Sequence, residues 1–377
     1  METALVNARV LLPQGLREGL AVTMADGHIS SVSSEPPAGA TIVDCGGAML
    51  LPGFIDTQVN GGGGVLFNDA PTVETIATIA RAHRRFGTTG LLPTLISDDL
   101  DVVAAAIRAV DDAIEAGVPG VLGIHIEGPF LSFARRGIHD ATRLRRIDKD
   151  AIALLGSARH GKTLVTLAPE CVSPGDISAL VAAGVIVAAG HSEADYDVVR
   201  RAIGEGVSGF THLFNAMSPL VNRAPGMTGA ALEDDRTTAG LIVDGHHVHP
   251  AVIRIALKAK GHERLMLVTD AMALTGTDGD HFLLQGREIR RDGDRLVDAG
   301  GTLAGSTLTM AAAVSNMIAQ TGIDLRRAVA MASSTPATFL GLADRTGAIA
   351  PGLAADLILV DDGWNVRRSW IAGREAA

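Results

Sequence analysis

Cysteine and aromatic residues are scarce in this chain of 377 residues. It has two cysteines, Cys45 and Cys171, and only 3% Phe, Trp and Tyr. Two cysteines cannot form a disulfide framework, and the opening METALVNARV lacks the charged-then-apolar order of a signal peptide. We therefore expect a protein of the reducing cytoplasm. Few aromatic side chains also argue against stacking platforms for single-stranded nucleic acid.

Basic residues are also in deficit. The chain has 32 Lys and Arg against 42 Asp and Glu, a formal net charge of −10. This balance argues against nucleic acid or an anionic membrane surface as the main partner. With 47% hydrophobic and 20% charged residues, the composition is that of a globular protein. Its length suits one large catalytic domain with a smaller appendage.

Glycine, by contrast, is abundant, and its 44 copies often follow short apolar runs. Such runs, rich in β-branched residues, predict strands that end in loops. Eight of them lie in the middle of the chain: Met49–Asn60, Thr88–Leu95, Val121–Glu127, Thr163–Pro169, Val185–His191, Gly209–Phe214, Thr238–Asp244 and Arg264–Asp270.

Helical patterns separate several of these runs. Leu100, Val103, Ile107, Val110 and Ile114 recur with helical spacing before a glycine that suits a helix end. Repeated strand–helix units imply parallel strands joined by right-handed crossovers, and eight units predict a (β/α)₈ barrel. A doubly wound open sheet is the alternative, although no G-x-G-x-x-G follows the first strand.

The two ends of the chain have a different pattern. Short strands flank the turn residues Asp26-Gly27 near the start and Asp362-Gly363 near the end. Neither end can bury enough apolar area alone, so we expect residues 1–50 and 347–377 to form one small β-sandwich beside a barrel of residues 51–346. The turn Asp292-Gly293, between Phe282–Ile289 and Arg295–Val297, predicts a hairpin inserted after the eighth strand, where a lid could lie.

Ligand-type side chains stand at the ends of several predicted strands. Alternation along the third strand directs Gly123, His125 and Glu127 into the barrel, and along the fifth it directs Val185, Val187, Ala189 and His191 inward. His212 lies near the end of the sixth run, and Asp270 ends the eighth. One carboxylate and two imidazoles at the rim, Glu127, His191 and His212, form a donor set that suits catalytic zinc. His125 lies deeper and suits packing better than ligation.

A run of glycines, Gly61–Gly64, follows the first predicted strand. It lacks the Lys-Ser/Thr ending of a phosphate-binding P-loop, so we expect a flexible loop there.

Eight segments between residues 51 and 361 carry more specific information. They are LPGFIDTQVNGGGG, HIEGPFL, GHSEADYD, THLFNAMSPL, DGHHVHP, LVTDAMA, LAGSTLTM and PGLAADLILVD. In this order they closely resemble the N-acetylglucosamine-6-phosphate deacetylases of the amidohydrolase superfamily. The resemblance implies a (β/α)₈ barrel with a β-sandwich built from both termini, in agreement with the strand pattern.

The resemblance also assigns roles to residues. It implies metal ligation by Glu127, His191 and His212, and places the general base and acid at Asp270. Substrate contacts would fall on Ile138, His139, Asn215, Ala216, Arg223, His247, Leu303, Ala304 and Gly305. We expect His247 to act on the acetyl oxygen as well, and Arg223 to bind phosphate, in this family from a neighbouring subunit.

One departure from the superfamily pattern concerns the first strand. Many members have His-x-His there, whereas this chain has Gln58-Val59-Asn60. Amides are poor substitutes for imidazole toward a transition metal, so we expect one divalent ion. Zinc is favoured, but iron, cobalt or manganese would accept the same ligands.

The implied reaction is metal-dependent hydrolysis of the acetamide of N-acetylglucosamine 6-phosphate, to glucosamine 6-phosphate and acetate, in amino-sugar catabolism or cell-wall recycling. The implied partners are a phosphorylated amino sugar and a second copy of the chain in a homodimer. Two alternatives remain at this point. One is another amidohydrolase, such as an N-acyl-D-amino-acid deacylase or a dihydroorotase-like enzyme, and the other is a non-catalytic barrel relative.

Overall fold

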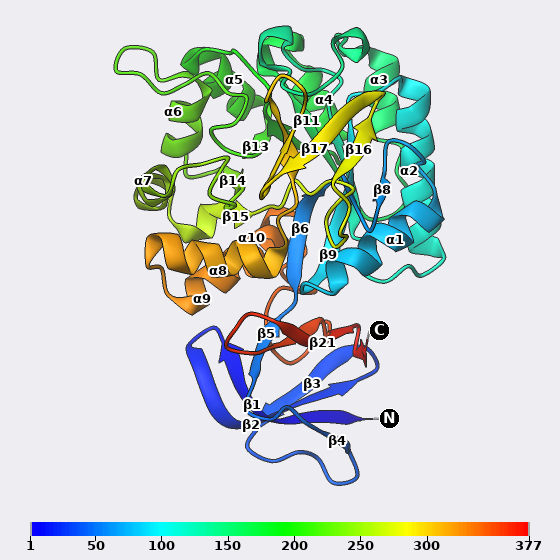
Figure 1. Ribbon diagram of the computed structural model, residues 1–377, viewed down its shortest axis with the longest axis vertical. Helices are drawn as coiled ribbons and strands as arrows, with labels where there is room; N and C mark the ends of the chain where they lie inside the picture. Colours follow the sequence, from blue (N-terminus) through cyan, green and yellow to red (C-terminus); the bar gives the residue numbers. More distant parts are fainter. Residues whose placement is uncertain (1, 376–377) are drawn as a thin grey trace.

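The computed structural model describes residues 2–375, whose largest part is a barrel of eight parallel strands (Figure 1). Around the barrel they are β6 (Phe54–Val59), β9 (Thr88–Ile96), β10 (Gly123–Glu127), β11 (Lys162–Leu167), β12 (Ile186–Ala189), β13 (Val207–Phe210), β14 (Thr238–Leu241) and β15 (Leu265–Leu267). The segment after β15 returns to β6, where Asp270 N donates to Gln58 O at 3.0 Å. The predicted (β/α)₈ barrel is confirmed, and the doubly wound alternative is wrong.

Helices follow the strands and cover the outside of the barrel. They are α1 (Val73–Arg84), α2 (Leu100–Glu115), α3 (Lys149–Leu155), α4 (Asp176–Ala182), α5 (Tyr196–Glu205), α6 (Gly226–Glu233), α7 (Pro250–Lys260), α8 (Met310–Thr321) and α9 (Leu325–Ala332). The last helix, α10 (Ser334–Phe339), packs instead with interior residues such as Ile55 and Leu164. The helical spacing predicted for α2 is confirmed, because Val103, Ile107 and Val110 are all buried against the barrel. Each such burial stabilises the fold by about 1.5–3 kcal/mol.

The first predicted strand, Met49–Asn60, is in fact two strands. β5 (Met49–Pro52) pairs with strands of the small domain, whereas β6 belongs to the barrel. Gly53 separates them, and a Cβ at this position would lie 2.0 Å from Thr89 Oγ1. Only glycine lets the chain pass this point, so the apolar run continues across a junction between two sheets.

The inward face of β12 differs from the predicted alternation. Ala188 pairs with Thr166 and Ile186 with Leu164, and this set faces the barrel interior. Val187 and Ala189 instead pack against the outer helices. The expected inward set of Val185, Val187 and Ala189 is therefore wrong, and His191 reaches the barrel mouth by another route.

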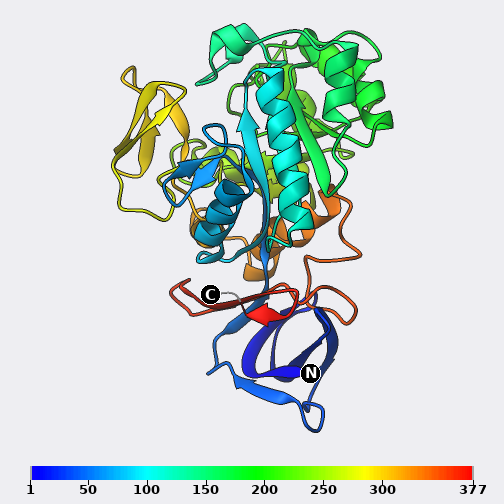
Figure 2. The ribbon, with the colours of Figure 1, turned by 90° about the vertical axis from the view of Figure 1, so that its right-hand side faces the viewer.

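Both chain ends contribute to one small β domain below the barrel (Figures 1 and 2). Its strands are β1 (Thr3–Leu12), β2 (Gly15–Ala25), β3 (His28–Ser33), β4 (Thr41–Asp44), β5, β20 (Leu357–Val360), β21 (Val366–Ile371) and β22 (Arg374–Glu375). They form a single hydrogen-bonded sheet in which β5 lies between β1 and β20. The sheet encloses a core that includes Leu5, Val22, Leu357 and Trp370. The predicted pairing of the two termini is confirmed, as are both of their turns.

The insertion after β15 is larger than one hairpin. It is a four-stranded antiparallel sheet of β16 (His281–Leu284), β17 (Arg287–Asp292), β18 (Arg295–Val297) and β19 (Leu303–Ser306). The predicted strand Phe282–Ile289 is interrupted by a turn at Gln285 and Gly286, with φ of +48° and +80°. Figure 2 shows this sheet in yellow at one side of the barrel.

The glycine run after β6 is not the flexible loop that we expected. Gly61 and Gly62 form the short strand β7 (Gly61–Gly62), which pairs with β8 (Val65–Leu66). Both glycines are buried, and a Cβ on Gly61 would lie 2.4 Å from the carbonyl oxygen of Val65. Close packing of the backbone therefore accounts for the first two glycines, and the turn that follows accounts for Gly63 and Gly64, with φ of +65° and +90°.

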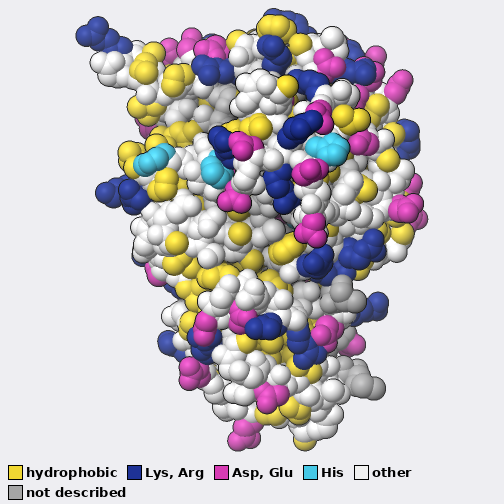
Figure 3. Space-filling model, in the orientation of Figure 1, with side chains coloured by type: hydrophobic (Ala, Val, Ile, Leu, Met, Phe, Trp, Pro, Cys, Tyr) yellow, Lys and Arg dark blue, Asp and Glu magenta, His cyan; other side chains and the backbone are white. Residues whose placement is uncertain are grey.

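Basic and acidic side chains are interspersed over the face drawn in Figure 3. Within residues 2–375, no helix combines the length and apolar character needed to cross a bilayer.

Candidate active site

The carboxyl ends of the barrel strands surround one cavity of about 230 Å³. Glu127 is the last residue of β10, His191 and His212 follow β12 and β13 by two residues, and Asp270 follows β15 by three. The lining residues are Asn60, Ile96, Glu127, Gly137, Ile138, His139, His191, His212, Asn215, Ala216, Ile242, His247, Asp270, Met272, Thr302, Leu303 and Gly305. The structure therefore brings together the four residues expected to carry the chemistry.

Three ligand-type atoms at the base of this cavity are in mutual contact. Glu127 Oε1 lies 3.1 Å from His191 Nε2 and 3.0 Å from His212 Nε2, and the two nitrogens are 3.0 Å apart. Donors bound to one ion at about 2.0–2.1 Å in tetrahedral geometry are about 3.3 Å apart. The carboxylate and imidazole set thus fits a single divalent ion in both spacing and chemistry.

The ring of His191 is oriented by a hydrogen bond at its other nitrogen. His191 Nδ1 donates to Arg135 O at 2.8 Å, so Nε2, which faces Glu127, is the ring nitrogen that binds a metal once it gives up its proton. This arrangement is typical of metal-binding histidines, whose other ring nitrogen donates to a carbonyl or carboxylate. Burial alone would raise the pKa of Glu127, but hydrogen bonds from His191 and His212 hold it well below its usual range. The carboxylate is therefore ionised, as a ligand must be.

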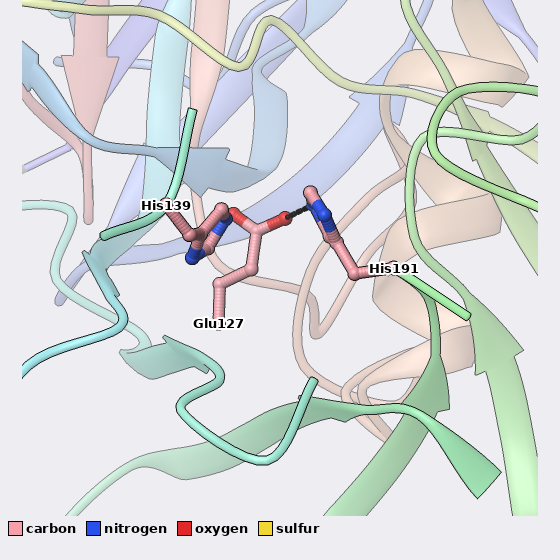
Figure 4. A group of neighbouring side chains, drawn as sticks. All are labelled: Glu127, His139 and His191. Carbon is pink, nitrogen blue, oxygen red and sulfur yellow. Dashed lines mark hydrogen bonds and ion pairs between the residues drawn. The ribbon is translucent and has the colours of Figure 1, made fainter. Parts of the chain in front are cut away.

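A third histidine, His139, lies beside this group (Figure 4). One of its ring nitrogens is within 4.8 Å of ligand atoms of Glu127 and His191. However, its Nδ1 accepts from Ser97 N at 3.3 Å, and burial lowers its pKa to about 3. A neutral ring that accepts at Nδ1 carries its proton on Nε2 and has no lone pair there for a metal. His139 is consequently a hydrogen-bond donor, and His212 suits the third ligand position better.

Two amides from the end of β6 contact the Asp270 carboxylate. Asn60 Nδ2 donates to Asp270 Oδ1 at 2.6 Å, and Gln58 Nε2 donates both to Asp270 Oδ1 at 3.2 Å and to Glu127 Oε2 at 3.1 Å. Burial and the charge of Glu127 raise the pKa of Asp270 to about 6. A carboxyl group with a raised pKa can both accept and return a proton near neutral pH.

Backbone conformation marks the same residues. His191, His212 and Asp270 have φ of +47°, +32° and +50°, in the left-handed region that side chains other than glycine seldom adopt. Such conformations concentrate at functional sites, where surrounding contacts compensate for their cost of about 1–3 kcal/mol each. The reversed backbone turns His191 into the cavity although β12 has the opposite alternation.

The expected substrate contacts are only partly brought together. Ile138, His139, Asn215, Ala216, His247, Leu303 and Gly305 line the cavity. Ala304 does not, because it is buried in the core of the inserted sheet. Arg223 is exposed on the segment between β13 and α6 and is also absent from the lining.

The sequence analysis missed two residues that orient the histidines of the cavity, Asp244 and Ser97. Asp244 accepts from His247 Nδ1 at 2.6 Å, and its other oxygen accepts from the backbone N–H groups of His246 and His247. An aspartate three residues before a histidine was the available signal. Ser97, which fixes His139, gave no signal of its own.

His125 occupies the barrel interior below Glu127. Its Nε2 lies 2.8 Å from Thr166 Oγ1, and its Nδ1 lies 3.3 Å from Thr94 Oγ1. Both ring nitrogens thus have hydroxyl partners, and burial lowers its pKa to about 4. This environment agrees with a packing role.

A barrel with these side chains at its carboxyl end has the architecture of metal-dependent hydrolases. The model of the amidohydrolase family matches residues 49–375, and the chain belongs to that family.

More specific relatives are found within it. The chain is 47% identical to an N-acetylgalactosamine-6-phosphate deacetylase of Shewanella sp. (strain ANA-3), over 97% of this chain and 94% of that protein. Its fold superposes on N-acetylglucosamine-6-phosphate deacetylase from Pasteurella multocida with a TM-score of 0.97 at 34% identity, covering 100% of both chains. A variant of the Mycobacterium smegmatis enzyme, solved with N-acetyl-D-glucosamine-6-phosphate, gives 0.90 at 36% identity over 99% of both chains. The resemblance seen in the sequence motifs is confirmed.

Proposed function

We propose that this protein hydrolyses the acetamide of N-acetylglucosamine 6-phosphate to glucosamine 6-phosphate and acetate. One observation carries the proposal: Glu127, His191 and His212 meet within 3.1 Å of one another at the mouth of the barrel, with Asp270 lining the same cavity. The alternative of a non-catalytic barrel relative explains the chain less well, because the chain has the full set of ligand and acid–base residues.

The cofactor in this proposal is one divalent ion, with zinc favoured, held by Glu127, His191 and His212. When bound, such an ion lowers the pKa of water from 15.7 to about 7 and polarises a carbonyl oxygen. A second ion near β6 is disfavoured because the Gln58 and Asn60 amides already donate to the Asp270 and Glu127 carboxylates.

Asp270 carries the proton in this scheme. Its carboxylate accepts a proton from the attacking water and then delivers it to the departing amide nitrogen, which cannot leave as an anion. The amides of Gln58 and Asn60 orient the carboxylate for both steps. The raised pKa matches this double role, since the group must be basic first and acidic afterwards.

Two histidines contact the substrate in different ways. His139 presents its Nε2–H to the cavity and suits donation to the acetyl oxygen as negative charge develops there. We expected His247 in that role, but its Nδ1–H is bound by Asp244. Its Nε2 then carries a lone pair, which suits accepting a hydrogen bond from a sugar hydroxyl. Removing a donor to a developing oxyanion typically costs about 10²–10³ in turnover.

The phosphate group of the substrate needs a cationic partner, and a single chain supplies no Lys or Arg side chain to the described cavity lining. Arg223 is exposed, and so are its neighbours Leu220 and Val221, at 54% and 48%. An exposed apolar pair beside an arginine fits a surface that a second copy covers. We therefore propose a homodimer in which Arg223 of each chain binds the phosphate in the site of the other.

Replacing Arg223 with alanine is expected to raise KM for the phosphorylated sugar about 10- to 100-fold, the loss of one or two charge-assisted hydrogen bonds. KM for unphosphorylated N-acetylglucosamine should stay within about twofold, because the contact is to phosphate alone. Steady-state kinetics on both sugars measures this. Equal increases for the two sugars would exclude phosphate binding by Arg223.

Mixed dimers test whether Arg223 acts across the subunit interface. Chains carrying Arg223→Ala and chains carrying Asp270→Asn, mixed and allowed to exchange, form heterodimers in which one site has both native residues. Activity should recover to about a quarter of the wild-type value when equal amounts exchange fully. No recovery, with exchange shown by mass spectrometry, would place Arg223 in its own chain's site or outside both sites.

The relatives differ in the sugar for which they are named, so the configuration of the substrate at C4 is left open. The 47% identical Shewanella protein is named for N-acetylgalactosamine 6-phosphate, whereas the Pasteurella and Mycobacterium proteins are named for the glucosamine form. N-acetylgalactosamine 6-phosphate is therefore the second candidate substrate, and it differs only at the C4 hydroxyl. Comparing kcat/KM for the two sugars, with an N-acyl-D-amino acid as a third substrate, decides between them. A higher kcat/KM for the galactosamine form would overturn our primary assignment.

A further inference from the structure

The inserted sheet is docked on the rim of the active site by an apolar contact. Leu284 and Ile289 of the insert share a buried cluster with Ile96, at the end of β9, and Met272, after β15. Ile138 packs against the same cluster. Since Ile96, Ile138 and Met272 also line the active-site cavity, the insert backs one wall of the site.

The turn between β16 and β17, together with the first residue of β17, makes polar contacts with two segments of that wall. Gln285 Nε2 donates to Ser97 O at 2.9 Å and lies 3.3 Å from Asp98 Oδ2. Arg287 Nη2 donates to Ile138 O. One turn of the insert therefore binds the backbone at two positions that are far apart in sequence.

These two backbone positions are the immediate supports of His139. Ser97 contacts His139 Nδ1 through its backbone N–H at 3.3 Å and through its hydroxyl at 2.8 Å. Ile138 is the preceding residue in the chain. The contacts to Ser97 keep the ring proton on Nε2, so anything that moves Ser97 or Ile138 changes the donor that faces the cavity.

The conformation of Gln285 shows that the turn is held at a cost. Its φ is +48°, unusual for a side chain of this size, and its Oε1 is buried with no hydrogen-bond partner among residues 2–375. A buried unsatisfied acceptor costs about 1–3 kcal/mol. The nitrogen of this amide keeps its hydrogen bond to Ser97 O although the oxygen of the same amide is unpaired.

We propose that Gln285 and Arg287 are positioning residues that hold His139 in its donor tautomer and orientation. The consequence for catalysis rests on the function proposed above, in which His139 donates to the acetyl oxygen. The proposal extends the active-site machinery to an inserted sheet outside the barrel and gives two of its residues a defined role.

Kinetics of Gln285→Ala/Arg287→Ala provides the first test. We expect kcat to fall about tenfold, part of the 10²–10³ lost when an oxyanion donor is removed. KM should change less than twofold, because the donor acts mainly on charge that develops during the reaction. Arg287→Lys, combined with native Gln285, should recover most of the rate by donating to the same carbonyl.

Arg290→Ala is the matched control. Arg290 is on the same strand and is largely exposed, and within residues 2–375 its side chain forms an ion pair with Glu288 of β17 alone. It removes the same charge from the insert without touching Ser97 or Ile138, and its kinetics should equal those of the wild type. An equal fall in kcat for this variant would overturn the proposal in favour of a general charge effect of the insert.

A measurement without substrate separates this proposal from the proposed function. Ring ¹⁵N chemical shifts of His139 should show the proton on Nε2 in the wild type and a mixture of tautomers in the double variant. Amide hydrogen exchange should accelerate at Ser97 and His139 but not in the apolar cluster, which keeps the insert docked. Unchanged His139 shifts and exchange would refute the positioning role even if the enzyme proves to be a deacetylase. A wild type inactive on every acetylated sugar phosphate, with the expected shifts, would refute only the function.

Discussion

Asp270→Asn is expected to abolish measurable deacetylation while the folded protein keeps its metal. General acid–base catalysis contributes about 10²–10⁴ in rate, and in the proposed mechanism one carboxylate performs both the proton abstraction and its return. Asparagine has the same shape but neither accepts nor delivers a proton. We expect kcat to fall by about 10³ or more, measured by release of the free amine.

The same variant should remain folded and loaded. The Gln58 and Asn60 amides that donate to Asp270 can rotate to meet the new side chain, so the loss of stability should be small. Elemental analysis should find the wild-type metal content, because the three proposed ligands are intact. Asp280→Asn, at an exposed aspartate, controls for the charge change and should be fully active. Near-normal turnover in Asp270→Asn would remove this residue from the mechanism.

The barrel was predictable because its strands can be recognised in the sequence as continuous apolar runs. A parallel strand that is covered by helices and faces a packed interior is apolar on both sides, as β9 and β11 are, and such runs stand out in a sequence. The ends of those runs also located Glu127, His191, His212 and Asp270, since the carboxyl ends of parallel strands converge. Their meeting in one cavity could then be expected without any coordinates.

Other features depend on tertiary contacts that no local pattern records. The alternation that pointed His191 inward fails in β12, and the side chain reaches the site only because its backbone adopts φ of +47°. The division of the first strand at Gly53 depends on the closeness of Thr89, which comes from another strand. The turn at Gln285 has a residue that rarely adopts positive φ, so the run Phe282–Ile289 looked like a single strand.

The supports of the reacting groups were hidden for a related reason. Ser97 acts on His139 partly through its backbone N–H, which any residue type except proline could supply. Asp244 acts on His247 within a turn whose only sequence mark is a short Asp-to-His spacing. Motif resemblance identifies residues that touch substrate or metal, but it gives less guidance about residues that hold them.

Glu127→Gln should remove both the metal and the activity. Glu127 is 2% exposed and is the only carboxylate within hydrogen-bond distance of His191 and His212 among the described residues. Its negative charge offsets that of a dication and stabilises it in a buried site, and glutamine offers only a neutral oxygen. We expect the metal content to fall to about a tenth or less, and kcat by about 10³, as the activated water and the polarised carbonyl are both lost.

Thermal unfolding gives a second readout that does not require substrate. A ligand bound only to the folded state raises the free energy of unfolding, so a chelator should lower the Tm of the wild type and leave that of Glu127→Gln unchanged. His125→Gln is the matched control, two residues earlier on the same strand. His125 is buried against Thr94 and Thr166, so its loss should lower Tm through packing while the metal content and the chelator response remain. Metal loss in the His125 variant but not in the Glu127 variant would mean that the ion, if any, binds deeper in the barrel than the three-residue site at its mouth.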